Sequence, residues 1–202
     1  MLRKSHSNET FINFSKYRLT MVNIYKLKLT NLQQGIVRLL CVKAGISLNQ
    51  RQIANFLGVT QPAVIKALPV LEKGDLIKVQ QDKETRRWSI ELNRDNYKMM
   101  HLKRVDNLNH IYESGLADFL EKHFAGGTII LFGSYSRGED IIHSDIDIAV
   151  IGRKNKLIDA TPYEKILERR INLNFYGRFK DIHKRLRENL CNGIVLSGGV
   201  EL

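Results

Sequence analysis

The sequence predicts an α+β protein in two parts: a helical N-terminal half that ends in a β-hairpin, and a small C-terminal α/β domain with a mixed sheet. Three observations predict this fold class. Short helical patterns and a hairpin pattern follow one another between residues 46 and 92. Strand and helix patterns alternate from residue 128 to residue 200. The positive charge is also uneven, because residues 1–94 hold 16 Lys and Arg against 6 Asp and Glu.

Length and composition limit the number of domains and the kinds of partner that the protein can have. The 202 residues allow one or two domains, and we divide them near Arg94 into 1–94 and 95–202. Cys41 and Cys191 show neither metal-ligand spacing nor a disulfide framework. No signal-peptide core and no run of transmembrane length are present, so we expect a cytoplasmic protein without a membrane partner. The net charge of +11 lies mostly in the first half, which is where a polyanion should bind.

The first helix of the N-terminal half has a clear start signal. Residues 1–28 are polar and basic, and their pattern does not decide between a free arm and local packing. Thr30, with Gln33 three residues later, forms a capping box. Gly45 should close the helix. Its apolar stripe is Leu32, Ile36, Leu39 and Leu40.

Two shorter helices and a hairpin follow. Asn49 can cap the first of these helices, and Gly58 fits the position after it, where a positive φ is favoured. Thr60 can cap the second helix, with Pro62 in its first turn. Strand patterns at 76–80 and 87–92 flank a charged turn. This order predicts a helix-turn-helix with a β-hairpin wing.

The segment resembles the winged helix-turn-helix of bacterial and archaeal regulators. The resemblance implies that the second helix enters a major groove of duplex DNA and that the wing contacts phosphates or a minor groove. Pro69 lies inside that helix and should kink it or remove a hydrogen bond. A winged helix used only for packing or dimerisation is the alternative. The predicted DNA-binding residues are Thr60, Gln61 and Lys66 in the helix and Lys83, Arg86 and Arg87 in the wing.

A connector from residue 95 to residue 124 is helical in pattern and is interrupted at Ser114 and Gly115. It is expected either to pack in the core or to carry a homodimer contact. The predicted apolar side consists of Leu102, Val105, Leu108, Ile111 and Tyr112.

The most informative stretch runs from residue 128 to residue 151. A buried strand, 128–132, stops at Gly133 and Ser134, and an alternating strand follows from Asp145 to residue 151. Alternation places Asp145 and Asp147 on one face, about 7 Å apart along the strand. Two such carboxylates can hold Mg²⁺ or Mn²⁺, with phosphates and water completing the coordination shell. Gly133 allows close approach of backbone to a phosphate, and the Ser134 hydroxyl with following N–H groups can bind the anion.

Gly-Ser-x-x-x-Gly followed by Asp-x-Asp on the next strand resembles the DNA polymerase β-type nucleotidyltransferases, in particular the minimal nucleotidyltransferases of prokaryotes. The resemblance implies a nucleoside triphosphate substrate, expected to be ATP, and a third carboxylate on a later strand. That strand is predicted at 171–176, where Asn172 occupies the third catalytic position beside Asp145 and Asp147. An amide does not accept a proton at neutral pH. His143 is expected to be a loop residue, although a proton shuttle is an alternative.

Three functional hypotheses follow. The first is an active enzyme that transfers a nucleoside monophosphate to an acceptor hydroxyl and carries a DNA-binding regulatory domain. The second is a transcriptional regulator whose nucleotidyltransferase domain has become a nucleotide sensor or a scaffold. The third, implied by the resemblance alone, is an antitoxin that binds or modifies a small helical toxin protein.

Overall fold

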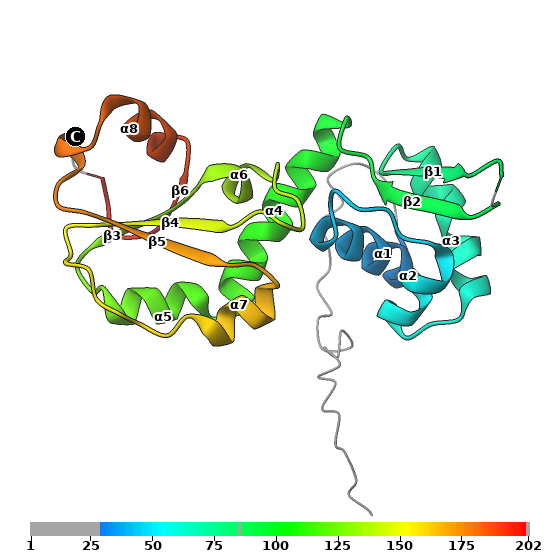
Figure 1. The fold of residues 1–202 in the computed structure, drawn as a ribbon, viewed down its shortest axis with the longest axis horizontal. Coiled ribbons are helices and arrows are strands. Elements are labelled where there is room, and N and C mark those ends of the chain that lie inside the picture. The colour runs from blue at the N-terminus through cyan, green and yellow to red at the C-terminus, as the bar shows by residue number, and fades with distance from the viewer. Residues whose placement is uncertain (1–28, 85, 201–202) are drawn as a thin grey trace, which may run out of the picture.

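The computed structural model describes residues 29–84 and 86–200. The N-terminal part of the protein is a winged helix (Figure 1). The predicted segment 1–28 lies outside the described residues. Three helices precede a two-stranded antiparallel hairpin, as the sequence predicted. The elements are α1 (Asn31–Val42), α2 (Gln50–Leu57), α3 (Gln61–Lys73), β1 (Ile77–Gln81) and β2 (Trp88–Leu92).

Local signals explain where these helices begin and end. Thr30 and Asn49 both form complete capping boxes. Gly58 adopts a left-handed φ of 63° after α2, a conformation that glycine reaches without a Cβ penalty. Thr60 precedes α3 but its side chain makes no capping hydrogen bond, in contrast to the expectation. Helix α3 continues through Pro69 to its end at Lys73.

The winged helix has its own hydrophobic core. Helices α1, α2 and α3 contribute apolar side chains that are packed together with those of the hairpin. Leu48 and Ile90 exchange two backbone hydrogen bonds of 2.8 Å, which fasten the loop before α2 to the hairpin. Cys41 is buried in this core, and burial raises the pKa of its thiol, which therefore stays protonated at neutral pH.

Helix α4 (Tyr97–Glu113) extends from the winged helix to the C-terminal part and is followed by α5 (Leu116–His123) (Figure 1). Ser114 and Gly115 separate the two helices, as predicted. The predicted buried side of α4 is wrong in part, because Val105 is 58% exposed and Tyr112 is 49% exposed. The buried face instead follows a spacing of four residues and consists of Met99, Lys103, Asn107 and Ile111.

The C-terminal part is built on a four-stranded mixed sheet with the order β5-β4-β3-β6. Strands β4 and β5 are parallel, whereas β3 is antiparallel to both β4 and β6. Helices α5 and α7 lie on one side of the sheet and α8 lies on the other (Figure 1). The bounds are β3 (Thr128–Phe132), α6 (Gly133–Arg137), β4 (Ile146–Ile151), α7 (Thr161–Leu167), β5 (Ile171–Tyr176), a 3₁₀ turn (Phe179–Asp181), α8 (Lys184–Cys191) and β6 (Ile194–Ser197).

A buried polar cluster holds α4 against the C-terminal domain. Asp140 is 1% exposed and pairs with the ammonium of Lys103, which is fully buried on α4. The same carboxylate accepts a hydrogen bond of 2.7 Å from the Asn107 amide. The guanidinium of Arg169 lies 3.6 Å from the second oxygen of Asp140. These contacts explain why Lys103 and Asn107 lie on the buried face of α4 together with the apolar Met99 and Ile111.

Among the described helices, none is by itself long and apolar enough to cross a membrane. Only α2 and α3 taken together have the required length and composition, and the pair is bent by 108°.

We expect Asp140→Ala to destabilise the protein by about 3–5 kcal/mol, because it leaves the Lys103 ammonium buried without its carboxylate. Chemical denaturation of the purified chain measures this loss. Asp181→Ala, which breaks the solvent-exposed pair with Arg178, is the control and should leave the unfolding free energy nearly unchanged. Similar stabilities for the two variants would contradict the structural role of Asp140.

Candidate nucleotide and metal site

Asp145, Asp147 and Asn172 lie together at neighbouring ends of the parallel strands β4 and β5. Asp147 and Asn172 are register partners, and Asp145 directly precedes β4. The Asn172 amide nitrogen lies 3.1 Å from a carboxylate oxygen of Asp145 and 3.3 Å from one of Asp147. The structure therefore brings the three predicted catalytic residues into one cluster, with Asn172 between the two acids.

The charge of this cluster is uncompensated within the part of the chain that the structure describes. Neither Asp145 nor Asp147 forms an ion pair with a described Lys, Arg or His, and the donor they share is the neutral amide. Two adjacent carboxylates without a cation repel each other, so a divalent metal ion fits this site electrostatically. Burial, and after it the charge of Asp147, raises the pKa of the Tyr176 phenol on the same sheet.

The donor set also limits the kind of metal site. No group of three or more His, Cys, Asp or Glu side chains suited to a metal occurs among the described residues. A metal at Asp145 and Asp147 would therefore need further oxygen ligands from a substrate or from water. This requirement matches Mg²⁺, which is usually held by one or two carboxylates together with substrate phosphates.

Gly133 brings the start of α6 against the acidic pair. Its φ is 75°, and a Cβ at this position would lie 2.6 Å from a carboxylate oxygen of Asp147. Phe132 pairs with Asp147 across β3 and β4, which fixes this approach. The Ser136 hydroxyl donates a hydrogen bond of 2.9 Å to the Gly133 carbonyl and stabilises the turn. Glycine is thus required beside the carboxylate, and half-buried Ser134 follows it at the start of the helix.

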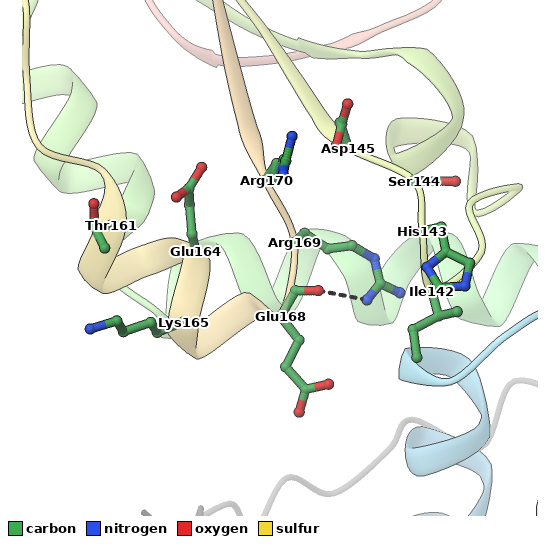
Figure 2. Close-up of a pocket in the computed structure, with 10 residues that line it drawn as sticks. All are labelled: Ile142, His143, Ser144, Asp145, Thr161, Glu164, Lys165, Glu168, Arg169 and Arg170. Carbon is green, nitrogen blue, oxygen red and sulfur yellow. Dashed lines mark hydrogen bonds between the residues drawn. The ribbon is translucent and has the colours of Figure 1, made fainter.

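A cavity of about 590 Å³ opens beside Asp145, between the loop that precedes β4 and helix α7 (Figure 2). Glu164 accepts a hydrogen bond of 2.9 Å from the backbone N–H of Ile171 and so supports the start of β5. His143 lies on the cavity wall in an exposed turn. The lining residues are Ile142, His143, Ser144, Asp145, Thr161, Glu164, Lys165, Glu168, Arg169 and Arg170.

The sequence analysis did not identify the buried polar residues that support the segments around this site. Lys103, Asn107 and Asp140 were not predicted to be buried, and Arg169 was not singled out. The four-residue spacing of Met99, Lys103, Asn107 and Ile111 places them on one helix face, but two of the four are polar, so no local signal marked that face as buried.

The predicted DNA-binding residues lie on two surface elements of the winged helix. Thr60, Gln61 and Lys66 are exposed at and after the start of α3, and the Gln61 amide lies 3.4 Å from the Gln50 side chain. Lys83, Arg86 and Arg87 are exposed in the turn between β1 and β2. The backbone carbonyl of Arg87 accepts a 2.9 Å hydrogen bond that closes this turn. The structure places both groups at the surface, and their contact with DNA stays a prediction.

Residues 113–193 match the family model described as a nucleotidyltransferase domain. The C-terminal part of this chain therefore contains a nucleotidyltransferase domain, which confirms the resemblance identified in the sequence.

Similarities to solved structures fall on bacterial regulators. The adhesin competence repressor AdcR from Streptococcus pyogenes is 26% identical, with 52% of this chain and 72% of that chain covered and a TM-score of 0.39. MepR of S. aureus in its DNA complex is 27% identical, with coverages of 47% and 77% and a TM-score of 0.35. ZitR of Lactococcus lactis, a zinc-responsive MarR family member, is 23% identical, with coverages of 54% and 72% and a TM-score of 0.39. The winged helix is identified from its own elements, because these TM-scores are low. The comparison with curated proteins gave no match.

We expect the protein to bind ATP only together with Mg²⁺ or Mn²⁺, because bare phosphates are repelled by Asp145 and Asp147. Replacing both by Asn should abolish metal-dependent binding and preserve the fold. Isothermal titration calorimetry with and without the metal measures this effect. The control, Asp118→Asn with Glu121→Gln on α5, removes the same charge away from the site and should bind normally. Equal ATP affinity of the wild type with and without metal would refute the metal site.

Proposed function

We propose that this protein is a metal-dependent nucleotidyltransferase of the cytoplasm that is joined to a DNA-binding regulatory domain. The transferred group would be a nucleoside monophosphate, taken to be AMP from ATP, and the receiving group an acceptor hydroxyl. The observation that carries the proposal is the convergence of Asp145, Asp147 and Asn172 beside Gly133, in a segment that matches a nucleotidyltransferase domain.

The residues of the site suit the parts of this reaction. Asp145 and Asp147 would hold Mg²⁺, which when bound neutralises charge on the phosphates. Ser134 and the N–H groups at the start of α6 would bind the β- and γ-phosphates. Attack of the acceptor oxygen on the α-phosphorus forms the new P–O bond, and pyrophosphate leaves. In this arrangement the chain supplies charge compensation and positioning.

Asn172 sets the expected rate. In related nucleotidyltransferases a carboxylate at the corresponding strand position assists removal of the acceptor proton, and the Asn172 amide has no basic site for that task. It instead donates hydrogen bonds to the two acids. We therefore infer slow transfer, or transfer that depends on a partner which supplies the base.

The same observation favours a second candidate function, a regulator whose C-terminal domain senses a nucleotide without transferring it. In that case Asn172 would serve only to hold Asp145 and Asp147 in place. The antitoxin hypothesis, with a toxin as partner, and the homodimer remain predictions from the sequence.

Asn172→Asp distinguishes the two functions. If the domain is an enzyme that lacks a base, the substitution should raise the transfer rate by about 10²–10⁴-fold, the usual size of general-base assistance. Incubation with α-labelled ATP, Mg²⁺ and candidate acceptors measures this rate as covalent label. Asn174→Asp, two residues along the same strand and with the same added charge, is the matched control and should change little. Label that appears fast in the wild type and is unaffected by Asn172→Asp would contradict the assignment of the third position.

We further propose that the winged helix binds duplex DNA and regulates transcription. Support comes from the fold itself, from the exposed Lys66 on α3 and from the cationic turn of the wing. The N-terminal half also carries the excess of positive charge, and neutralisation of phosphates drives the non-specific part of DNA affinity. Helix α3 is exposed along its outer face, where Ile65 is 45% exposed, as a helix that enters a major groove must be.

Lys66→Ala and Arg86→Ala should each weaken binding of duplex DNA by the full-length chain. If the side chain meets a phosphate, the slope of log K against log salt should fall by about 0.9 for each substitution. Fluorescence anisotropy over a series of salt concentrations measures this slope. Lys122→Ala on α5 removes one positive charge from the other domain and should leave the slope unchanged. Absence of DNA binding by the wild type at low salt would refute the regulator hypothesis.

A further inference from the structure

The turn that ends α1, residues 42–45, touches both chain segments that lead to the nucleotide site. This turn belongs to the winged helix, where it joins α1 to the loop before α2. One segment, 140–144, precedes Asp145 and Asp147. The other, 168–170, precedes Asn172. The site of the C-terminal domain is therefore supported in part by the N-terminal domain.

The first segment is held by a backbone contact and by close packing. The N–H of Ile142 donates a hydrogen bond of 2.8 Å to the carbonyl of Ala44. Gly45 has a φ of 89°, and a Cβ there would lie 2.9 Å from two atoms of Ile141. Ser144 accepts a 3.0 Å hydrogen bond from the N–H of Ile141 and gives the segment a fixed bend. A displacement of the turn at Ala44 and Gly45 therefore displaces the residues just before Asp145.

The second segment is held by two side chains. Arg169 donates a 2.7 Å hydrogen bond to the carbonyl of Val42, and Glu168 pairs with Lys43. Arg169 extends from the start of β5 toward Ile142 of the first segment (Figure 2). It is 5% exposed, so this arrangement is fixed by packing. The backbone carbonyl of the next residue, Arg170, accepts a hydrogen bond of 2.8 Å from the N–H of Ile146. This bond joins the start of β5 to the start of β4.

We propose that residues 42–45 are a positioning element of the nucleotide site, and that through them nucleotide binding and DNA binding are thermodynamically coupled. The proposal rests on the proposed function. A metal ion at Asp145 and Asp147 would compete with the Asn172 amide for carboxylate oxygens, and in this proposal the resulting change is passed to the two segments that lead to these residues. Because both segments are fastened to the turn before α2, the state of the site biases the placement of the helix-turn-helix. Coupling of this kind is reciprocal.

The first experiment compares two glycine substitutions in the winged helix. Gly45→Ala and Gly58→Ala both place alanine at a positive φ, but only Gly45 abuts the C-terminal domain, since nothing lies within 4 Å of a Cβ at Gly58. Calorimetry of the full-length variants with ATP and Mg²⁺ should show an affinity changed about fivefold or more for Gly45→Ala. Gly58→Ala should match the wild type. Equal affinities for all three folded proteins would overturn the proposal.

A milder pair of variants covers the case in which Gly45→Ala does not fold. Lys43→Ala removes the ion pair with Glu168, whereas Lys78→Ala removes an ion pair with Asp95, which lies before α4 and outside both segments that lead to the site. Only Lys43→Ala should change the affinity for ATP with Mg²⁺. An unchanged affinity in Lys43→Ala would count against the positioning role.

The second experiment measures the coupling directly. The Kd of ATP with Mg²⁺ is determined with and without saturating duplex DNA, and the Kd of the same DNA with and without the nucleotide. Both should change by the same factor, between about 5- and 150-fold, because linkage is reciprocal. Two affinities that do not influence each other would overturn the coupling and leave the proposed function intact. If ATP does not bind with metal at all, it is the proposed function that fails, and the coupling with it.

Discussion

The pairing of one buried carboxylate, Asp140, fixes the arrangement on which the rest of the structure depends. Lys103 and Asn107 approach it from α4, and Arg169 approaches it from the start of β5. Ions removed from water are tolerated only with well-placed partners, and a buried pair of this kind constrains geometry more than it adds net stability. The helix between the domains, the loop after α6 and the segment just before β5 are therefore held in one relative position.

Carboxylates that are close in the sequence have opposite environments in the structure. Asp140 is enclosed and neutralised by cationic side chains, whereas among the described residues Asp145 and Asp147 receive side-chain hydrogen bonds from a neutral amide, that of Asn172. The first arrangement makes a structural anchor. The second leaves two carboxylates that form no ion pair with any Lys, Arg or His in the described part of the chain. A short loop thus separates a carboxylate that organises the fold from a pair that can bind a ligand.

Local signals in the sequence predicted much of the fold. Capping boxes at Thr30 and Asn49 marked helix starts, and alternation located β4 and β5 because side-chain direction in a strand repeats every two residues. The resemblance to polymerase β-type nucleotidyltransferases, rather than alternation, predicted that Asn172 would lie beside the acidic pair. The buried face of α4 was not predictable in this way, since Lys103 is buried by a partner 37 residues away. Likewise, the contact of residues 42–45 with the C-terminal domain depends on tertiary packing that no local pattern encodes.

The position of Asn172 on β5 has an evolutionary consequence. Strand β5 lies at the edge of the sheet, and the Asn172 side chain is exposed, so the hydrophobic core does not constrain which polar group stands there. A substitution at a core position changes the chemistry of the side chain and also costs packing, whereas a substitution at the exposed position 172 does not cost packing. Asparagine and aspartate codons differ by a single nucleotide. Under the proposed function, a lineage with this architecture would therefore exchange catalysis for nucleotide sensing, and back again, in one mutational step without compensating substitutions in the core.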